Sequence, residues 1–232
     1  MTKHAVTERR PADDPEVSRF DGLSVSTIVD AMYQLGLPEG AMEPSVRHIA
    51  GPRIQGRART VGRIVIPRNT NQAAMHPKLG MALYEVIDSL TSGDVLVISA
   101  EGDASYSTFG DNMALRCSIG GGVGVVTDAA VRDSTEIGEM GFGAYAGGVS
   151  IRPGQFRLLT ISADAPIVCG GVLVNPGDIV IADVDGVVVV PAKEAEAVAK
   201  RTIELTDAEN RKQKSVREGM SIVEAIKTYK VR

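Results

Sequence analysis

This 232-residue sequence contains few cysteines and histidines and has a small net charge, and each of these features argues against a class of site or partner. The two cysteines, Cys117 and Cys169, lack the C-x-x-C spacing of zinc and redox motifs, so we expect free thiols in a reducing compartment. The three histidines, His4, His48 and His76, form no H-E-x-x-H motif, which disfavours zinc or histidine-based catalysis. With 25 basic and 29 acidic residues, the net charge of −4 offers no footprint for nucleic acid, but it leaves room for a local site that binds a small anion.

Long apolar runs are also missing from the sequence. No stretch reaches the 18 or so apolar residues that a membrane-spanning helix needs. The first 19 residues are polar and lack the apolar core of a signal peptide. We therefore expect a cytoplasmic protein with no membrane partner.

Several catalytic and nucleotide-binding motifs are absent as well. There is no G-x-S-x-G motif of a serine hydrolase. A Schiff-base aldolase needs a desolvated lysine in its pocket, and the stretch 109–136, on which the site prediction below rests, contains none, although Lys78 remains an alternative. The glycine-rich run 120–124 does not match G-x-G-x-x-G and precedes an apolar strand, so we interpret it as a helix-to-strand connection rather than a phosphate site.

The pattern of apolar residues predicts one domain over residues 21–232, preceded by an extended, charged N-terminal arm over residues 1–20 that contains Pro11 and Pro15. Helical spacing predicts helices over residues 24–35, 77–90, 111–118, 192–214 and 222–230. Strands are expected over residues 56–67, 95–98, 123–127, 156–161, 167–168, 172–174, 179–182 and 187–190. Because short strands dominate the middle of the chain, we expect a layered α/β sandwich rather than a regular doubly wound sheet.

Acidic residues and an arginine flank the glycine-rich run. Asp111 precedes the pair Arg132-Asp133 by twenty intervening residues, and Asp128 is predicted to lie just past the strand 123–127. Ligands gather beyond the carboxyl ends of strands in α/β sheets, so we expect these side chains to converge. Carboxylates with several waters suit Mg²⁺, and the fork of an arginine matches a substrate carboxylate. This pattern favours a metal site for a 2-oxo acid, and the alternative is an ordinary surface ion pair between Arg132 and Asp133.

Three segments of the sequence are distinctive: G-D-V-L-V-I (93–98), G-V-V-T-D-A-A-V-R-D-S-T-E (124–136) and P-I-V-C-G-G-V-L-V-N-P-G-D-I-V-I-A-D-V-D-G-V-V-V-V-P (166–191). They resemble the RraA-like family, which includes the 4-hydroxy-4-methyl-2-oxoglutarate / 4-carboxy-4-hydroxy-2-oxoadipate aldolases and the regulator of ribonuclease activity A. The resemblance implies a three-layer β/β/α sandwich of the swivelling-domain type, as a single domain with flanking helices. It also implies assembly as a homotrimer or a dimer of trimers, with active sites between subunits.

The D-x20-R-D motif, which the metal-dependent aldolases of this family carry and the ribonuclease regulator lacks, is present here. The resemblance implies that Asp133 binds Mg²⁺ or Mn²⁺ directly and that Asp111 does so through water. Arg132 would bind the pyruvoyl group of a small 2-oxo acid, together with the backbone amides of Gly110, Asp111, Asn112 and Met113.

Acids of an adjacent subunit contribute to the site in these aldolases, and Glu39 and Glu43 are the candidates here. The implied activity is retro-aldol cleavage of a 4-hydroxy-2-oxo acid to pyruvate and a second oxo compound, with Arg132, Asp111 and Asp133 as catalytic residues and oxaloacetate decarboxylation as a side activity. Two alternatives remain: a non-catalytic regulatory or interaction protein, and a lyase that acts on another hydroxy-oxo acid such as a sugar-acid derivative.

Overall fold

The computed structural model describes residues 14–66, 77–155 and 157–230. A mixed sheet forms its centre, with the strand order β1-β6-β5-β3-β2-β10-β11, while β4 pairs with β5 and β7 pairs with β2. The strands are β1 (Arg47–Ala50), β2 (Ile54–Val65), β3 (Asp94–Ser99), β4 (Ser107–Phe109), β5 (Gly124–Val131), β6 (Gly143–Val149), β7 (Leu158–Ala163), β8 (Ile167–Cys169), β9 (Val172–Val174), β10 (Ile179–Asp183) and β11 (Gly186–Val190). The helices are α1 (Val25–Gln34), α2 (Pro77–Asp88), α3 (Asp111–Ile119), α4 (Ser134–Glu139), α5 (Ala195–Arg217) and α6 (Ile222–Tyr229).

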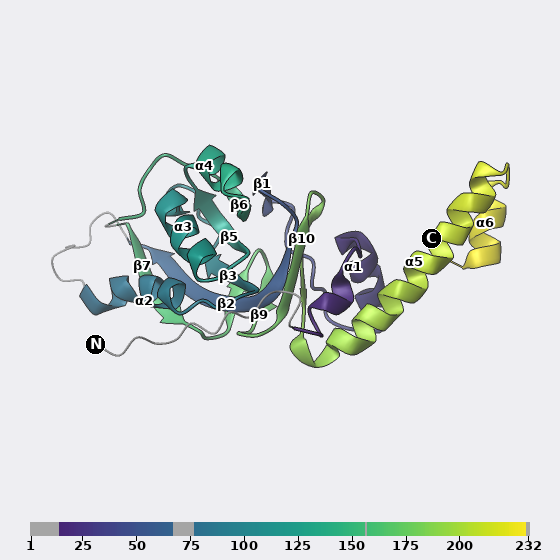
Figure 1. Cartoon of the computed structure of the whole chain (residues 1–232), viewed down its shortest axis with the longest axis horizontal. Coiled ribbons are helices and arrows are strands. Elements are labelled where there is room, and N and C mark those ends of the chain that lie inside the picture. The colour runs from purple at the N-terminus through teal and green to yellow at the C-terminus, as the bar shows by residue number, and fades with distance from the viewer. Residues whose placement is uncertain (1–13, 67–76, 156, 231–232) are drawn as a thin grey trace.

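Strands β3 and β5 are parallel neighbours and are buried along their whole length, as continuous apolar runs predict for strands covered on both faces. Helices α2, α3 and α4 lie together on one side of the sheet (Figure 1), and Leu83 and Cys117 from this side share a core with Leu96 and Val125. On the other face, Val97 and Val126 share a core with the residues of the β8–β9 hairpin. The expected β/β/α layering is therefore confirmed.

A second cluster of apolar residues joins α1 and α5 to the β10–β11 hairpin, where Ile28 and Val198 pack with Ile181. Figure 1 shows α5 running away from the sheet, with α6 lying along its far end. The hydroxyl groups of Ser215 and Tyr229 lie 2.7 Å apart and fix this contact. The two helices begin and end close to the predicted positions, and Ser221 caps α6 by accepting from the Glu224 amide at 3.2 Å, as its capping-box pattern predicts.

Residues 14–20 correct part of the prediction of an extended N-terminal arm. They form a turn followed by the 3-10 helix Ser18–Phe20, and Val17 and Phe20 are buried in the cluster that holds α1 and α5. Asp14 accepts from the Nε of Arg57 at 2.9 Å. Although partial burial acts in the opposite direction, this hydrogen bond and those from the Val17 and Glu16 amides lower the pKa of Asp14. The rest of the predicted arm, residues 1–13, lies outside the described residues.

Four short elements escaped the sequence-based prediction. Strand β1 lies outside every predicted helix and strand, β4 has three residues, and β6 reads G-A-Y-A-G-G-V, in which Val149 is the one β-branched residue. Helix α4 has six residues, too few to show helical periodicity. Strand β5 also runs four residues further than predicted, to Val131, so Asp128 lies within the strand. None of the helices within the described ranges is long and apolar enough to cross a bilayer.

The docking of residues 14–20 predicts a large stability effect at Phe20, which has no exposed surface. We expect Phe20→Ala to lower the free energy of unfolding by about 3–5 kcal/mol, because it leaves a cavity among α1, α5 and β10. Urea unfolding followed by circular dichroism measures this change. Tyr33→Ala is the control, because Tyr33 is 84% exposed and its loss should change the free energy by less than about 0.5 kcal/mol. A Phe20→Ala protein as stable as the control would contradict the docked arrangement.

Candidate functional site

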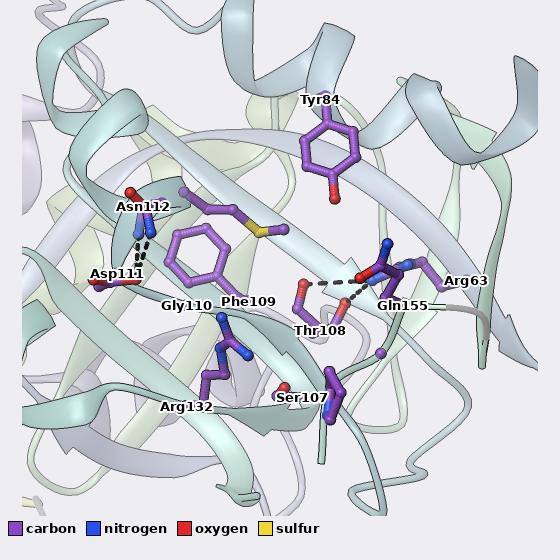
Figure 2. A pocket seen from close by; sticks show the side chains of 13 residues that line it. Arg63, Tyr84, Ser107, Thr108, Phe109, Gly110, Asp111, Asn112, Arg132 and Gln155 are labelled. Carbon is purple, nitrogen blue, oxygen red and sulfur yellow. Dashed lines mark hydrogen bonds between the residues drawn. The ribbon is translucent and has the colours of Figure 1, made fainter. Parts of the chain in front are cut away.

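A pocket of about 260 Å³ lies where β4 ends and α3 begins. Its walls come from residues 107–113, from residues 153–155, and from the side chains of Arg63, Tyr84 and Arg132. Figure 2 shows Arg132 at one end of the pocket and Arg63 at the other, with Thr108 between them. Of the predicted site residues, Gly110, Asp111, Asn112, Met113 and Arg132 are all on this wall.

Parallel pairing of β4 with β5 brings the two halves of the D-x20-R-D motif together. Phe109 pairs with Val131, and the Arg132 amide donates to the Phe109 carbonyl at 3.0 Å. The chain therefore leaves β4 at Gly110 directly beside the point where Arg132 leaves β5. Helix α3 starts at Asp111, so the positive end of its dipole faces the same place, which is a favourable position for an anion. Of the four backbone amides predicted to bind the substrate, those of Asp111, Asn112 and Met113 already donate to the Asp133 carboxylate, the Asp111 carboxylate and the Gly110 carbonyl.

Asp133 holds the centre of this arrangement, although it lies behind the pocket wall rather than on it. Its Oδ2 accepts from the Nε of Arg132 at 3.1 Å and from the backbone amide of Asp111 at 3.3 Å. Its backbone is left-handed, with φ 56° and ψ 40°, a conformation that non-glycine residues rarely adopt and that concentrates at functional sites. Asp133 thus orients the guanidinium of Arg132 and the first turn of α3 at once.

A glycine at position 110 is required for the contacts that Asp133 makes with Arg132 and with the start of α3. A Cβ at Gly110 would lie 2.7 Å from the Oδ2 of Asp133 and 3.1 Å from the Nε of Arg132. Its extended backbone is available to any residue, so the reason for glycine is space rather than conformation. Any larger side chain at this position displaces the aspartate and arginine that face it.

The carboxylates of Asp111 and Asp133 fit a hard divalent cation. The Oδ1 of Asp111 accepts from the Asn112 amide at 2.7 Å and from the Asn112 side chain at 3.1 Å. Each aspartate keeps one carboxylate oxygen that receives no hydrogen bond from the described residues. Mg²⁺ is commonly bound by one or two carboxylates and several waters. No group of three or more histidine, cysteine, aspartate or glutamate residues that could hold a metal occurs among the described residues.

Asp128 does not converge with Asp111 and Asp133, which corrects the sequence-based expectation. It is buried in β5, where its Oδ1 accepts from the Ala100 amide at 2.6 Å and its Oδ2 accepts from the Ser99 hydroxyl at 3.2 Å. This carboxylate closes the turn after β3 instead of facing the pocket.

Glu39 and Glu43 are exposed on the loop before β1 and do not line the pocket of their own chain.

The glycine-rich run 120–124 connects α3 to β5, as interpreted from the sequence. A Cβ at Gly121 would lie 2.6 Å from the Cα of Ser92, and the φ angle of Gly121 is +93°. Cys117 and Cys169 are free, as expected, and both are buried. Burial raises the pKa of the Cys117 thiol to about 12, so this thiol is not poised for nucleophilic catalysis.

Sequence reasoning missed Arg63, Tyr84, Thr108 and Gln155 on the pocket wall. Arg63 lies in β2, and its burial lowers the pKa of the guanidinium to about 10, while the Tyr84 phenol acts in the opposite direction. The available signal was an arginine within the otherwise apolar run V-G-R-I-V-I-P, because a buried charge needs a partner or a ligand. The other three carry no signal without the fold.

Comparisons with known proteins agree with these features. The family described as RraA-like (Aldolase/RraA) matches residues 25–189. Protein DlpA of Legionella pneumophila is 30% identical over 206 residues, which are 87% of this chain and 32% of that protein. A protein of Halalkalibacterium halodurans named "Putative 4-hydroxy-4-methyl-2-oxoglutarate aldolase" is 33% identical over 140 residues, which are 60% of this chain and 64% of that protein. This chain therefore spans about a third of the first relative and less than two thirds of the second.

Among solved structures, Streptomyces coelicolor RraAS2 has a similar fold. It is described as an unusual member of the RNase ES inhibitor RraA protein family, and it superposes with a TM-score of 0.76 at 28% identity. The superposition covers 89% of this chain and 100% of that chain.

The placement of Asp128 predicts a structural role for this residue. We expect Asp128→Ala to lower the free energy of unfolding by about 1–3 kcal/mol, because the buried Ala100 amide loses its acceptor. Chemical denaturation measures the change, and Asp185→Ala, at an exposed turn residue, is the matched control. An Asp128→Ala protein as stable as the control would mean that this carboxylate does not hold the turn.

Proposed function

This chain belongs to the RraA-like family, and from that premise and the geometry of its pocket we propose that it is a divalent-metal-dependent carbon–carbon lyase. Its substrate is a 4-hydroxy-2-oxo acid, which it cleaves to pyruvate and a second oxo compound. The observation that carries the proposal is the joint placement of Arg132, Asp133 and Asp111 by the β4–β5 pair at one end of a pocket. Aldolase names among its relatives support the same reaction class.

In this proposal Arg132 binds the carboxylate end of the substrate. Its Nε is held by Asp133, which leaves the outer nitrogens of the guanidinium for the bidentate contact that arginine makes with a carboxylate. The positive end of the α3 dipole, which lies at Asp111, adds a favourable electrostatic interaction on the same side. Together they fix the 2-oxo acid group and stabilise the negative charge that develops on its oxygen, which is commonly the largest contribution to such catalysis.

The free oxygens of Asp133 and Asp111 would hold Mg²⁺ or Mn²⁺, the first directly and the second through water. When bound, the cation supplies positive charge beside the 2-oxo group and so lowers the free energy of an enolate. In the reaction, the C4 hydroxyl proton leaves to Asp111 through a water, and the C4 carbonyl forms as the C3–C4 bond breaks. The electron pair of that bond becomes the pyruvate enolate, and protonation at C3 completes pyruvate. Oxaloacetate gives the same enolate on loss of CO₂, so it should be decarboxylated as a side reaction.

The active sites are proposed to lie between subunits of a trimer or a dimer of trimers. Exposed apolar side chains on α6, which include Ile222 and Val223, offer surface for such an assembly. Glu39 and Glu43 are exposed on the loop before β1, where they are free to reach the pocket of a neighbouring subunit.

A non-catalytic regulator is the alternative function, because one structural relative is described within an RNase inhibitor family. A coupled assay with lactate dehydrogenase separates the two. We expect pyruvate release from 4-hydroxy-4-methyl-2-oxoglutarate and from oxaloacetate in the presence of Mg²⁺, and its loss on addition of EDTA. Absence of metal-dependent pyruvate release from these substrates would favour the regulator.

Arg132→Ala tests the role of the arginine in the same assay. Because it removes the donor to the developing oxyanion, we expect kcat to fall by about 10²- to 10³-fold. Arg116→Ala is the control, since Arg116 pairs with Asp88 on the outer surface of α3 and does not line the pocket. A near wild-type kcat for Arg132→Ala would eliminate the proposed role.

Gly110→Ala tests the positioning of Asp133. The added methyl group has no space beside the Oδ2 of Asp133, and displacement of a catalytic group by an ångström costs about 10²-fold in rate. We expect a loss of this size in kcat/KM with the protein still folded. Gly141→Ala is the control, because a Cβ there meets nothing within 4 Å. Its φ of +70° costs some stability but does not affect the pocket. Equal activity of the two variants would show that Gly110 is not a spatial requirement of the site.

A further inference from the structure

Arg63 is a largely buried cation without an acidic partner in the described chain. Its Nη1 donates to the Thr108 hydroxyl at 2.7 Å and more weakly to the Thr108 carbonyl at 3.4 Å, and its Nη2 donates to the Leu158 carbonyl at 3.1 Å. Its Nε is buried and has no hydrogen-bond partner among the residues that the structure describes. All of its partners there are neutral, so no described residue compensates its positive charge.

Two other arginines of β2 have carboxylate partners. Arg57 pairs with Asp14 and Glu16, and Arg59 pairs with Asp164 and Asp94. Arg63 therefore differs from its neighbours on the same strand in that it lacks an acidic partner among the described residues. Residues 67–76, which follow this strand in the sequence, contain no aspartate or glutamate. A buried charge without a partner destabilises the folded protein unless a ligand compensates it.

The position of Arg63 shows where such a ligand would lie. It lines the pocket at the end opposite Arg132, with Thr108 between the two, as Figure 2 shows. Tyr84 and Gln155, which line the same end, add a phenol and an amide as further donors. Of the side chains on the described pocket wall, Asp111 alone is a carboxylate. The pocket thus has a cation at each end and a volume suited to a small metabolite.

We propose that Arg63 binds a second carboxylate of the substrate, so that the pocket selects 2-oxo acids with an anionic group at each end. This inference rests on the proposed function, because it assigns the 2-oxo acid end to Arg132. Thr108 acts as a positioning residue that holds the guanidinium toward the pocket. The second carboxylate of the substrate pairs with the positive charge of Arg63, whereas a substrate with one carboxylate leaves this charge unpaired.

The test compares two substrates that differ by that carboxylate. Both 4-hydroxy-4-methyl-2-oxoglutarate and 4-hydroxy-2-oxopentanoate release pyruvate on cleavage, and the second has a hydrogen in place of the distal carboxylate. We expect Arg63→Met to lower the ratio of kcat/KM for the first over the second by about 10²- to 10³-fold, as truncation of a buried charged partner does. Arg63→Lys, which keeps the charge but loses the fork, should give an intermediate ratio and serves if the methionine variant does not fold. Arg116→Met, the control, should leave the ratio unchanged.

A binding measurement separates failure of this inference from failure of the proposed function. With Mg²⁺ present, 2-oxoglutarate should raise the Tm of the wild-type protein more than 2-oxobutanoate does, and Arg63→Met should abolish the difference. If the wild-type protein releases no pyruvate but this pattern holds, the lyase function fails and the subsite stands. If pyruvate is released but Arg63→Met leaves the substrate ratio unchanged, the subsite is wrong. A variant that loses both activities equally and dissociates in sedimentation would also overturn it, because the arginine would then pair with an acid of a neighbouring subunit.

Discussion

The close approach of Gly110 to Asp133 is the constraint on which the whole site depends. It exists because β4 and β5 run parallel and end side by side, so that the chain emerging from one strand lies against the chain emerging from the other. One carboxylate oxygen then contacts both the Arg132 guanidinium and the first amide of α3. No side chain larger than a hydrogen fits between them. The helices and the β8–β9 hairpin that bury β3 and β5 keep these strand ends rigid, and rigid elements position a site more accurately than loops do.

Some partly buried arginines of this protein form ion pairs with carboxylates, whereas the arginines at the pocket do so less completely. The partly buried arginines Arg57 and Arg59 have carboxylate partners that come from distant parts of the sequence. At the pocket, Arg63 has only neutral hydrogen-bond partners within the described part of the chain, and Arg132 shares its aspartate with a backbone amide. An unpaired buried cation lowers the stability of the protein without ligand, and an anionic ligand offsets this loss. The distribution of ion pairs therefore separates the arginines that hold the fold together from the two arginines that we propose to bind a ligand.

Much of the fold was predictable because apolar periodicity is a strong signal. Helices α1, α2 and α5 and the buried strands β3 and β5 follow from it directly, with ends that differ by a few residues. Strand β6 was missed because glycine and alanine carry little strand preference, and β4 because three residues show no pattern. The candidate site was predicted from the spacing of Asp111 and Arg132-Asp133 together with the family resemblance. Asp128 shows the limit of spacing alone, since β5 runs four residues further than predicted and places Asp128 in the core instead of at the expected site.

The left-handed backbone of Asp133 has a consequence for how this fold diversifies. Glycine adopts that conformation without strain, whereas other residues pay on the order of 1–3 kcal/mol for it. The codons of aspartate and glycine differ at a single nucleotide, so one base change removes the central carboxylate and relaxes the backbone in the same step. Selection for stability and selection for the carboxylate therefore act in opposite directions at this position. A copy of the gene released from the second pressure would drift readily toward a folded, unreactive protein, which would then be free to acquire a role in binding.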